Sequence, residues 1–352
     1  MKNSKLFFIL VFFLITFTIS CKSTKSLVDV GCEENGNITA CLDKNYAGNN
    51  NIRQTLNIWL PCKIHHCDKK FPLIVHIHGG GFATGEKMEK PNIDFLEAGF
   101  AFSSINYRLI PESKFPDYLH DAKAAIRWLR SNNRDLRIDS SRIGIYGESA
   151  GGALTSYMAF TNGKNKVEIN GNIIDVEGNI GNNKNESSKI SAAINYYGHA
   201  DSKMFCDLKK GLDPNCEDTS DFCHSCTSPI SYIGKGRSVP YMIIHGTDDK
   251  LVPYIHGDML SKKFIEIYPN NNPELTFITV ENGGHGWWDK KTFDDISNSA
   301  KNFFLRNLNN NRDFKKEKNR TIVSEKLNYD DIYDKDIYDK DITNIEKQKN
   351  DK

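Results

Sequence analysis

A serine between two glycines is the residue of this chain whose setting points most directly to chemistry. The stretch Gly147-Glu148-Ser149-Ala150-Gly151 lies between a predicted strand and a predicted helix. Small residues on both sides of a serine permit the sharp turn that projects its hydroxyl above a sheet. Such a hydroxyl attacks carbonyl carbon once a neighbouring base removes its proton. An ordinary glycine-rich turn is the alternative, but the strand–turn–helix setting favours Ser149 as a nucleophile.

A base and an acid follow Ser149 along the chain, each after a predicted strand. His285 is flanked by glycines, which allow its ring to swing over a serine. Asp248 and Asp249 lie 36 to 37 residues before it, so either could hold the imidazole in the required tautomer. The order serine, acid, histidine is that of the α/β-hydrolase fold. The pattern predicts a triad of Ser149, His285 and one of these two aspartates.

A second glycine-rich stretch, His78-Gly79-Gly80-Gly81-Phe82, follows a buried-strand pattern. Glycines let backbone N–H groups point at a bound oxygen, so Gly80 and Gly81, with the N–H of Ala150, are predicted to form an oxyanion hole. His78 is interpreted as a structural hydrogen-bonding residue, and Phe82 is predicted to line the acyl side of the site. A phosphate-binding loop would need a Lys-Ser/Thr ending, which this stretch lacks.

These residues can meet only if the elements before them belong to one sheet. Apolar runs and alternation predict strands, and 3.6-residue spacing predicts one helix opening at Pro116 and another at Phe293–Leu308. The predicted strands are residues 54–60, Phe71–Ile77, Ala101–Tyr107, Arg142–Tyr146, Ala192–Tyr197, Tyr241–Ile244 and Leu275–Val280. Alternating strands and helices predict an α/β fold with a mostly parallel sheet covered on both faces. Residues 161–190 and Cys206–Cys226 are predicted to be surface excursions.

The nine cysteines favour an oxidising compartment. Apart from Cys21, they are eight in number and clustered by position, as disulfide partners are. We expect Cys32 with Cys41, Cys62 with Cys67, and two bonds among the last four, Cys206, Cys216, Cys223 and Cys226. Zinc is the competing interpretation, because histidines lie beside two of the clusters, but neither cluster has two ligand pairs at finger spacing. No metal is predicted from these clusters.

Both ends of the chain are predicted to lie outside the fold. Residues 1–21 combine two lysines with a 14-residue apolar run ending at Ile19, which is typical of a secretory signal. An uncleaved anchor and lipidation of Cys21 are the alternatives. Residues 22–35 are predicted to be a linker, 36–309 the domain, and 310–352 a disordered tail. The tail carries 11 basic and 11 acidic residues from 311 onward and a tandem Asp-Ile-Tyr-Asp-Lys repeat.

Composition excludes some classes of protein. The chain of 352 residues has 46 basic and 45 acidic side chains, a net charge of +1, so nothing favours a nucleic-acid partner. No apolar run reaches the roughly 18 to 20 residues of a spanning helix, which excludes a polytopic membrane protein. The predicted location is therefore extracellular, with membrane contact only through a lipid at Cys21. The oligomeric state is not predicted.

The chain resembles α/β-hydrolase esterases of the hormone-sensitive-lipase-like and the feruloyl- and acetylxylan-esterase-like groups. The matching stretches run from about Gln54 to His285 and include the two glycine-rich stretches and Val239–Pro253. In such enzymes the acid is the fifth residue of a His-Gly-x-x-Asp stretch, so the resemblance implies that Asp249 rather than Asp248 is the acid. It further implies hydrolysis of carboxylic esters without a metal or organic cofactor.

The substrate is expected to be a short-chain ester, either a small molecule or an acetyl or feruloyl group on polysaccharide. Trp287 and Trp288 follow His285 and could stack on a sugar or an aromatic acyl group, or pack beneath the loop. An amidase or arylformamidase, a lipase, or a peptidase of the same fold would use the same triad. A peptidase usually adds a propeller domain and a lipase an apolar lid. A non-catalytic binding module would lack a triad member, and all three are present.

Overall fold

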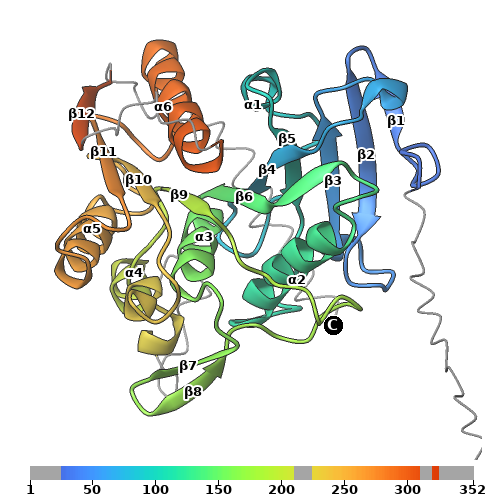
Figure 1. Cartoon of the computed structure of the whole chain (residues 1–352). Coiled ribbons are helices and arrows are strands. Elements are labelled where there is room, and N and C mark those ends of the chain that lie inside the picture. Colours follow the sequence, from blue (N-terminus) through green and yellow to red (C-terminus); the bar gives the residue numbers. More distant parts are fainter. Residues whose placement is uncertain (1–24, 210–223, 310–318, 325–352) are drawn as a thin grey trace, which may run out of the picture.

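The computed structural model describes residues 25–209, 224–309 and 319–324, in which strands and helices alternate along the chain (Figure 1). The strands are β1 (Glu33–Asn35), β2 (Ile38–Asn45), β3 (Thr55–Leu60), β4 (Phe71–Ile77), β5 (Ala101–Ile105), β6 (Ile138–Glu148), β7 (Lys166–Ile169), β8 (Asn172–Asp175), β9 (Ala192–Tyr196), β10 (Tyr241–Gly246), β11 (Leu275–Glu281) and β12 (Arg320–Val323). The α-helices are α1 (Ile93–Glu97), α2 (Asp117–Ser131), α3 (Ala150–Phe160), α4 (Ser202–Lys209), α5 (Ile255–Ile267) and α6 (Lys290–Leu308).

Ten of these strands form one sheet, in the order β1-β2-β3-β5-β4-β6-β9-β10-β11-β12. Every pairing from β5 to β12 is parallel, whereas β1, β2, β3 and β5 pair antiparallel. The predicted mostly parallel sheet is confirmed. Because the carboxyl ends of parallel strands meet at one edge, the loops after β4, β6, β9, β10 and β11 lie together there.

The sheet separates two apolar cores, because successive side chains of a strand point to opposite faces. In β4, Leu73 and Val75 belong to the core under α2, α3 and α5, and Ile74 belongs to the core under α1 and α6. All seven residues of β4 are buried, as a strand covered on both faces must be. The helices accordingly lie on both sides of the sheet in Figure 1.

The structure corrects the predicted limits of the domain. β1 begins at Glu33, inside the predicted linker, and β12 lies inside the predicted disordered tail, where it pairs in parallel with β11. The expectation of disorder is therefore wrong for Arg320–Val323. Both strands are short and have exposed side chains, so no apolar periodicity marks them, and only their partner strands define them. Residues 1–24, which include the predicted signal and Cys21, lie outside the described residues.

The excursion over residues 161–190 contains a separate two-stranded hairpin, β7–β8. Glu177, just after β8, contacts two buried cations of α2: its carboxylate lies 3.3 Å from Lys123 Nζ and 2.5 Å from Arg127 Nη1. Burial lowers the pKa of Lys123 to about 8, although the neighbouring Glu177 opposes that shift. The predicted surface excursion is thus held to the domain at its base by ion pairs.

One disulfide joins the segment before β1 to β2, and a second lies in the loop between β3 and β4. The predicted pairs Cys32–Cys41 and Cys62–Cys67 are both present. Cys206 and Cys226 are each disulfide-bonded, as expected of the third cluster, whereas Cys216 and Cys223 lie outside the described residues. Disulfides are typical of proteins from oxidising compartments, which is consistent with an extracellular protein.

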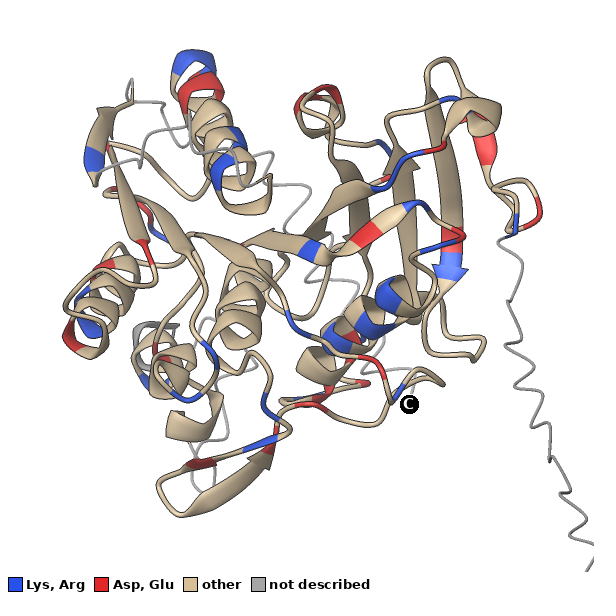
Figure 2. Cartoon of the chain, viewed as in Figure 1, with Lys and Arg blue, Asp and Glu red and all other residues tan. Residues whose placement is uncertain are grey.

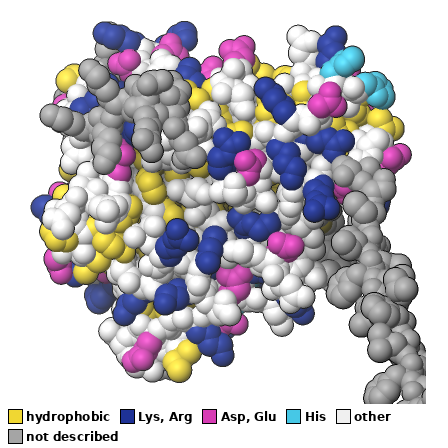
Figure 3. Space-filling model, viewed as in Figure 1, with side chains coloured by type: hydrophobic (Ala, Val, Ile, Leu, Met, Phe, Trp, Pro, Cys, Tyr) yellow, Lys and Arg dark blue, Asp and Glu magenta, His cyan; other side chains and the backbone are white. Residues whose placement is uncertain are grey.

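Charges of both signs are spread over the helices and loops (Figure 2). On the face shown in Figure 3, Lys and Arg side chains gather across the middle, with Asp and Glu between them. The whole chain carries a net charge of only +1. The absence of a nucleic-acid partner stays a prediction. Within the described part of the chain, no helix has the length and apolarity needed to cross a membrane.

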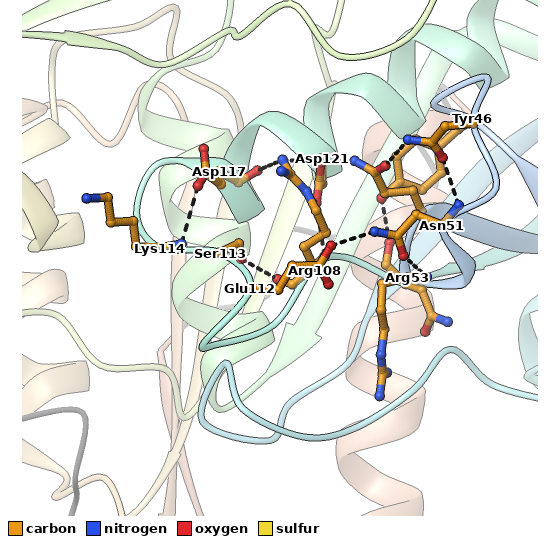
Figure 4. A network of polar contacts seen from close by, with 12 residues as sticks. Tyr46, Asn51, Arg53, Arg108, Glu112, Ser113, Lys114, Asp117 and Asp121 are labelled. Atoms are coloured by element: carbon orange, nitrogen blue, oxygen red, sulfur yellow. Dashed lines mark hydrogen bonds and ion pairs between the residues drawn. The ribbon is translucent and has the colours of Figure 1, made fainter. Parts of the chain in front are cut away.

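A buried polar network fixes the loop that follows β5 (Figure 4). The carboxylate of Asp121, on α2, is fully buried and accepts hydrogen bonds from Arg108 N, Nε and Nη2 at 3.0, 2.8 and 2.9 Å, and from Gln54 Nε2 at 2.7 Å. At the rim, Asn51 Nδ2 donates to Glu112 at 2.6 Å. The segment that carries Arg108 is therefore tied to both α2 and the loop before β3.

This segment supports the glycine-rich loop after β4. The Tyr107 hydroxyl donates to the carbonyl of His78 at 2.9 Å, and the N–H of Ile110 donates to the carbonyl of Phe82 at 2.8 Å. From the other side, Arg53 Nη1 donates to the carbonyl of Gly85 at 2.7 Å. Both ends of the glycine-rich loop are therefore held from outside, and Asp121 acts on the loop through the residues beside Arg108.

Replacing Asp121 by Asn tests this network. The amide would present a donor to Arg108 or Gln54 and leave the half-buried Arg108 guanidinium without its counter-charge, which costs at most the roughly 3 to 5 kcal/mol of a fully buried pair. We expect Asp121→Asn to lower the free energy of unfolding by up to that amount, measured by chemical denaturation. Asp258→Asn is the control, because Asp258 pairs with Lys262 near the surface, where a salt bridge contributes less than about 1 kcal/mol. Equal effects of the two variants would contradict this role.

Candidate active site

Ser149 lies in a strained turn at the carboxyl end of β6. Its backbone has φ 54° and ψ −118°, a region that non-glycine residues seldom adopt. Its N–H donates to the carbonyl of Tyr196 at 2.9 Å, and its carbonyl accepts from the N–H of Ala153 at 3.0 Å. Strained backbone that the surroundings hold in place is concentrated at functional sites. The local geometry is that of the strand–turn–helix elbow expected from the Gly-x-Ser-x-Gly pattern.

Close backbone packing explains why a glycine is needed two residues after this serine. A Cβ added to Gly151 would lie only 2.0 Å from the carbonyl oxygen of Ile77, at the end of β4. The first turn of α3 therefore packs directly on the neighbouring strand. Any side chain at residue 151 would push α3 away from the sheet and release the turn at Ser149.

His285 and Asp249 are hydrogen-bonded to each other, although 36 residues separate them in the chain. His285 Nδ1 lies 2.7 Å from Asp249 Oδ2, and the Asp249 side chain has no exposed surface. The second carboxylate oxygen accepts the N–H groups of Leu251 and Val252 at 2.9 and 2.8 Å. The structure therefore brings His285 to Asp249 and not to Asp248, whose N–H instead donates to the carbonyl of Gly283.

The environment of Asp249 keeps it ionised. Burial by itself raises the pKa of a carboxyl group, but polar contacts from His245 and His285 outweigh burial and lower the pKa of Asp249 to about 2. At neutral pH this residue is therefore a carboxylate. A buried carboxylate next to Nδ1 holds the imidazole with its Nε2 free to accept a proton.

The glycine-rich loop after β4 reaches the serine turn. A Cβ added to Gly79 would lie 3.3 Å from the Cβ of Ser149 and 2.9 Å from the carbonyl oxygen of Glu148. Among the residues that the structure describes, the N–H groups of Gly80, Gly81 and Ala150 have no acceptor. Backbone donors without an acceptor beside a strained serine are the arrangement that an oxyanion hole requires.

His78 is buried within this loop and serves as a support. Its ring stacks on Tyr107 with centroids 4.3 Å apart, and its Nδ1 donates to the carbonyl of Gly79 at 2.7 Å. Burial lowers the pKa of His78 to about 4, so the ring is neutral at physiological pH. These contacts agree with the structural role expected for His78.

Tyr197 is a residue of this site that the sequence patterns did not single out. It follows β9 directly, has φ 40°, and places its ring 4.5 Å from the imidazole of His285. A Cβ added to Gly286, whose φ is +79°, would lie 2.4 Å from the Tyr197 hydroxyl. Its position after a parallel strand was the available signal, because side chains there face the same edge of the sheet.

The predicted substrate-binding side chains separate into two groups. Phe82 is half-buried, stacks on Tyr118 at 4.3 Å and lies edge-on to His199 at 6.2 Å, so it belongs to an aromatic wall beside the glycine-rich loop. Trp288 donates to the carbonyl of Gly284 at 3.2 Å and packs on the core under α6. Its contacts favour the alternative that it packs beneath the loop. Trp287 lies 5.9 Å from the His285 ring.

No metal ligands gather at this edge or elsewhere in the described ranges, where no group of three or more His, Cys, Asp or Glu side chains could hold an ion. His65 and His66 form part of a short 3₁₀ helix, Ile64–His66, beside the Cys62–Cys67 disulfide. Both cysteines of that pair are therefore engaged with each other and not with zinc.

The pKa of Asp249 links this site to stability. Because the pKa falls from 3.8 to about 2 on folding, the ionised carboxylate stabilises the fold fully above about pH 4, and this contribution is lost as the pH falls through about 2. A shift of this size corresponds to about 2 kcal/mol. We expect the stability difference between wild type and Asp249→Asn to shrink by that amount between pH 6 and pH 2, measured by urea unfolding. A difference independent of pH would contradict the assigned ionisation.

Comparisons with known proteins agree with this geometry. The BD-FAE family model matches residues 56–264, more than half of the chain. The probable carboxylic ester hydrolase LipM of Mycobacterium tuberculosis is 26% identical over 196 residues, which are 52% of this chain and 42% of that protein. The chain thus spans less than half the length of this curated relative.

Solved structures extend the comparison to the fold. A truncated carbohydrate esterase from gut microbiota has a TM-score of 0.63 and 28% identity, and the match covers 77% of this chain and 96% of that one. Esterase 2 of Thermogutta terrifontis, in its propionate-bound form, has a TM-score of 0.56 and 21% identity, with coverage of 75% and 93%. The fold is that of the α/β hydrolases, and the chain belongs to the BD-FAE family within the α/β-hydrolase esterase group.

Proposed function

We propose that this protein is a serine carboxylesterase in which Ser149 is the nucleophile, His285 the general base and Asp249 the orienting acid. The observation that carries the proposal is the 2.7 Å hydrogen bond between His285 Nδ1 and Asp249 Oδ2 at the sheet edge where the strained Ser149 lies. The esterase names of the relatives support the reaction class. No metal or organic cofactor takes part in the proposed reaction.

The proposed reaction has two halves. His285 Nε2 accepts the proton of Ser149 while the Ser149 oxygen attacks the ester carbonyl carbon. The carbonyl oxygen becomes negative and accepts hydrogen bonds from the N–H groups of Gly80, Gly81 and Ala150. The alcohol departs with the proton from His285 and leaves an acyl-enzyme. Water, deprotonated by His285, then attacks the acyl carbon. His285 returns that proton to the departing Ser149 oxygen, which releases the acid and restores the free enzyme.

The proposed substrates are short-chain esters, with acetyl or feruloyl groups on polysaccharide as the extracellular candidates. The support comes from a neighbour described as a carbohydrate esterase from gut microbiota, of which the match covers 96%. The two disulfides are consistent with action outside the cell, where such polysaccharides occur. Phe82 is the proposed contact for the acyl group, because it lies in an aromatic wall beside the glycine-rich loop. Secretion, with or without a lipid at Cys21, is part of the proposal.

Hydrolysis of p-nitrophenyl esters from acetate to octanoate tests the reaction class. We expect activity that is highest for short acyl chains and that falls at least about 10³-fold in Ser149→Ala. Ser141→Ala is the matched control, because Ser141 is an exposed serine at the opposite end of β6. Acetylated xylan and a feruloylated oligosaccharide, assayed in parallel, test the substrate class.

Other outcomes would redirect the proposal. A preference for octanoate would favour a lipase, and turnover of p-nitroanilides or N-formyl anilines without turnover of esters would favour an amidase or arylformamidase. A folded preparation that is inactive on all of these would overturn the catalytic proposal in favour of a binding module. Activity on soluble esters with none on the polysaccharides would remove the polysaccharide substrates and leave the esterase.

A pair of glycine substitutions tests whether Tyr197 and the His285 loop must fit together. Gly286 and Gly171 have nearly the same φ, +79° and +78°, so alanine brings a similar strain of roughly 1 kcal/mol at both. Only at Gly286 would the new methyl group collide with Tyr197, whereas nothing lies within 4 Å of a Cβ at Gly171. We expect Gly286→Ala to lower kcat by about 10- to 100-fold and Gly171→Ala to leave it unchanged. Equal kcat values would show that the fit is unimportant.

A further inference from the structure

His245 is a buried polar side chain that the proposed reaction does not use. It lies in β10, four residues before Asp249, and has no exposed surface. Its Nε2 lies 2.7 Å from the carbonyl oxygen of Val252, and its Nδ1 is buried with no hydrogen-bond partner in the described part of the chain. A buried ring with one unpaired nitrogen costs free energy, so its presence beside Asp249 calls for a reason.

The contact with Val252 defines the protonation of this ring. A carbonyl oxygen can only accept, so Nε2 must carry the hydrogen and donate it. Tyr254 packs its ring edge-on to the imidazole, with centroids 5.9 Å apart. His245 is therefore a fixed donor directed at the turn that follows Asp249.

That turn holds one oxygen of the Asp249 carboxylate. The N–H of Val252 donates to Asp249 Oδ1 at 2.8 Å, while the carbonyl of the same residue accepts from His245. Val252 is thus fixed on both sides, by the acid and by the buried ring. The His245 side chain closes the turn against β10, which sets the position of the amide that binds Oδ1.

His245 also faces the other oxygen of this carboxylate. Its Nε2 lies 3.4 Å from Asp249 Oδ2, the oxygen that accepts from His285 at 2.7 Å. At 3.4 Å the contact is longer than a regular hydrogen bond, so Val252 is the main acceptor and Oδ2 feels the remaining pull of the N–H dipole. Both side chains are fully buried. In such a low-dielectric interior the N–H dipole interacts with the carboxylate more strongly than it would in water.

We propose that His245 is a positioning residue. It holds the Asp249 carboxylate through Val252, and its N–H interacts with the same negatively charged oxygen that His285 contacts. This inference rests on the proposed function, because it assigns a role within the Ser149, His285 and Asp249 site. His245 touches neither the substrate nor Ser149 in this role. It acts on the base through the acid.

The proposal predicts the direction of a pH effect. Without the N–H dipole of His245, more of the negative charge of Asp249 is available to the protonated imidazole of His285, which is stabilised relative to the neutral ring. Activity requires neutral His285, and therefore the acid limb of the kcat/KM profile moves to higher pH. The other titratable side chains that interact with Asp249 are His256 from α5 and Tyr197 after β9, and neither is changed in the His245 variants.

The test compares two substitutions of His245 in the full chain. Gln places an amide N–H near the position of Nε2, whereas Leu fills a similar volume without a donor. We expect His245→Leu to lower kcat by about 10-fold or more at nearly constant KM and to move the acid limb up by roughly 0.5 to 1 pH unit. His245→Gln should restore most of the wild-type kcat and most of the wild-type position of the acid limb. His256→Leu is the matched control, since His256 is equally buried and accepts only from the N–H of Ala200.

A second readout does not depend on hydrolysis. The proton between His285 Nδ1 and Asp249 gives a far-downfield ¹H NMR signal when the two groups are held together. We expect this signal to shift or broaden in His245→Leu and to return in His245→Gln. An acid limb and an NMR signal that are the same in His245→Leu, His256→Leu and wild type would overturn the inference while leaving the esterase proposal intact. An inactive wild type would overturn the esterase proposal, and the NMR comparison would still decide the role of His245.

Discussion

The tight contact between the first turn of α3 and the end of β4 is the constraint on which the rest of the site depends. A Cβ on Gly151 would lie 2.0 Å from the carbonyl of Ile77, so α3 can begin only where two backbones meet without a side chain. This contact forces the chain to reverse sharply at Ser149, and the φ of 54° shows that the backbone there is strained. The large parallel sheet supplies the stability that holds the strained turn in place.

The remaining parts of the site are placed by the same sheet edge, and each has its own buried support. The glycine-rich loop is fixed by Tyr107 and, at greater distance, by the fully buried Asp121. Asp249, the proposed acid, accepts hydrogen bonds from two backbone N–H groups, and His245 near the end of β10 lies 3.4 Å from its other oxygen. Rigid positioning of this kind is what the proposed reaction needs, since small displacements of the reacting groups lower the rate steeply.

The β7–β8 hairpin and the first strands of the sheet are held to the domain by ion pairs and disulfides. The β7–β8 hairpin depends on buried ion pairs between Glu177 and α2, and the first strands are closed by disulfides. A buried ion pair is costly to break, because removal of one partner leaves a charge without compensation. None of these ion pairs and disulfides involves Ser149, His285 or Asp249.

The sequence by itself determined the parallel sheet, the turn at Ser149 and the nearness of a histidine and an acid, because hydrophobic periodicity and glycine spacing are local signals. Only the tertiary structure decided that Trp288 packs under its loop, and that Tyr197 and His245 flank the hydrogen-bonded pair of His285 and Asp249. It also decided that Arg320–Val323 complete the sheet edge. Such contacts join residues far apart in the chain, and no pattern within either segment encodes them.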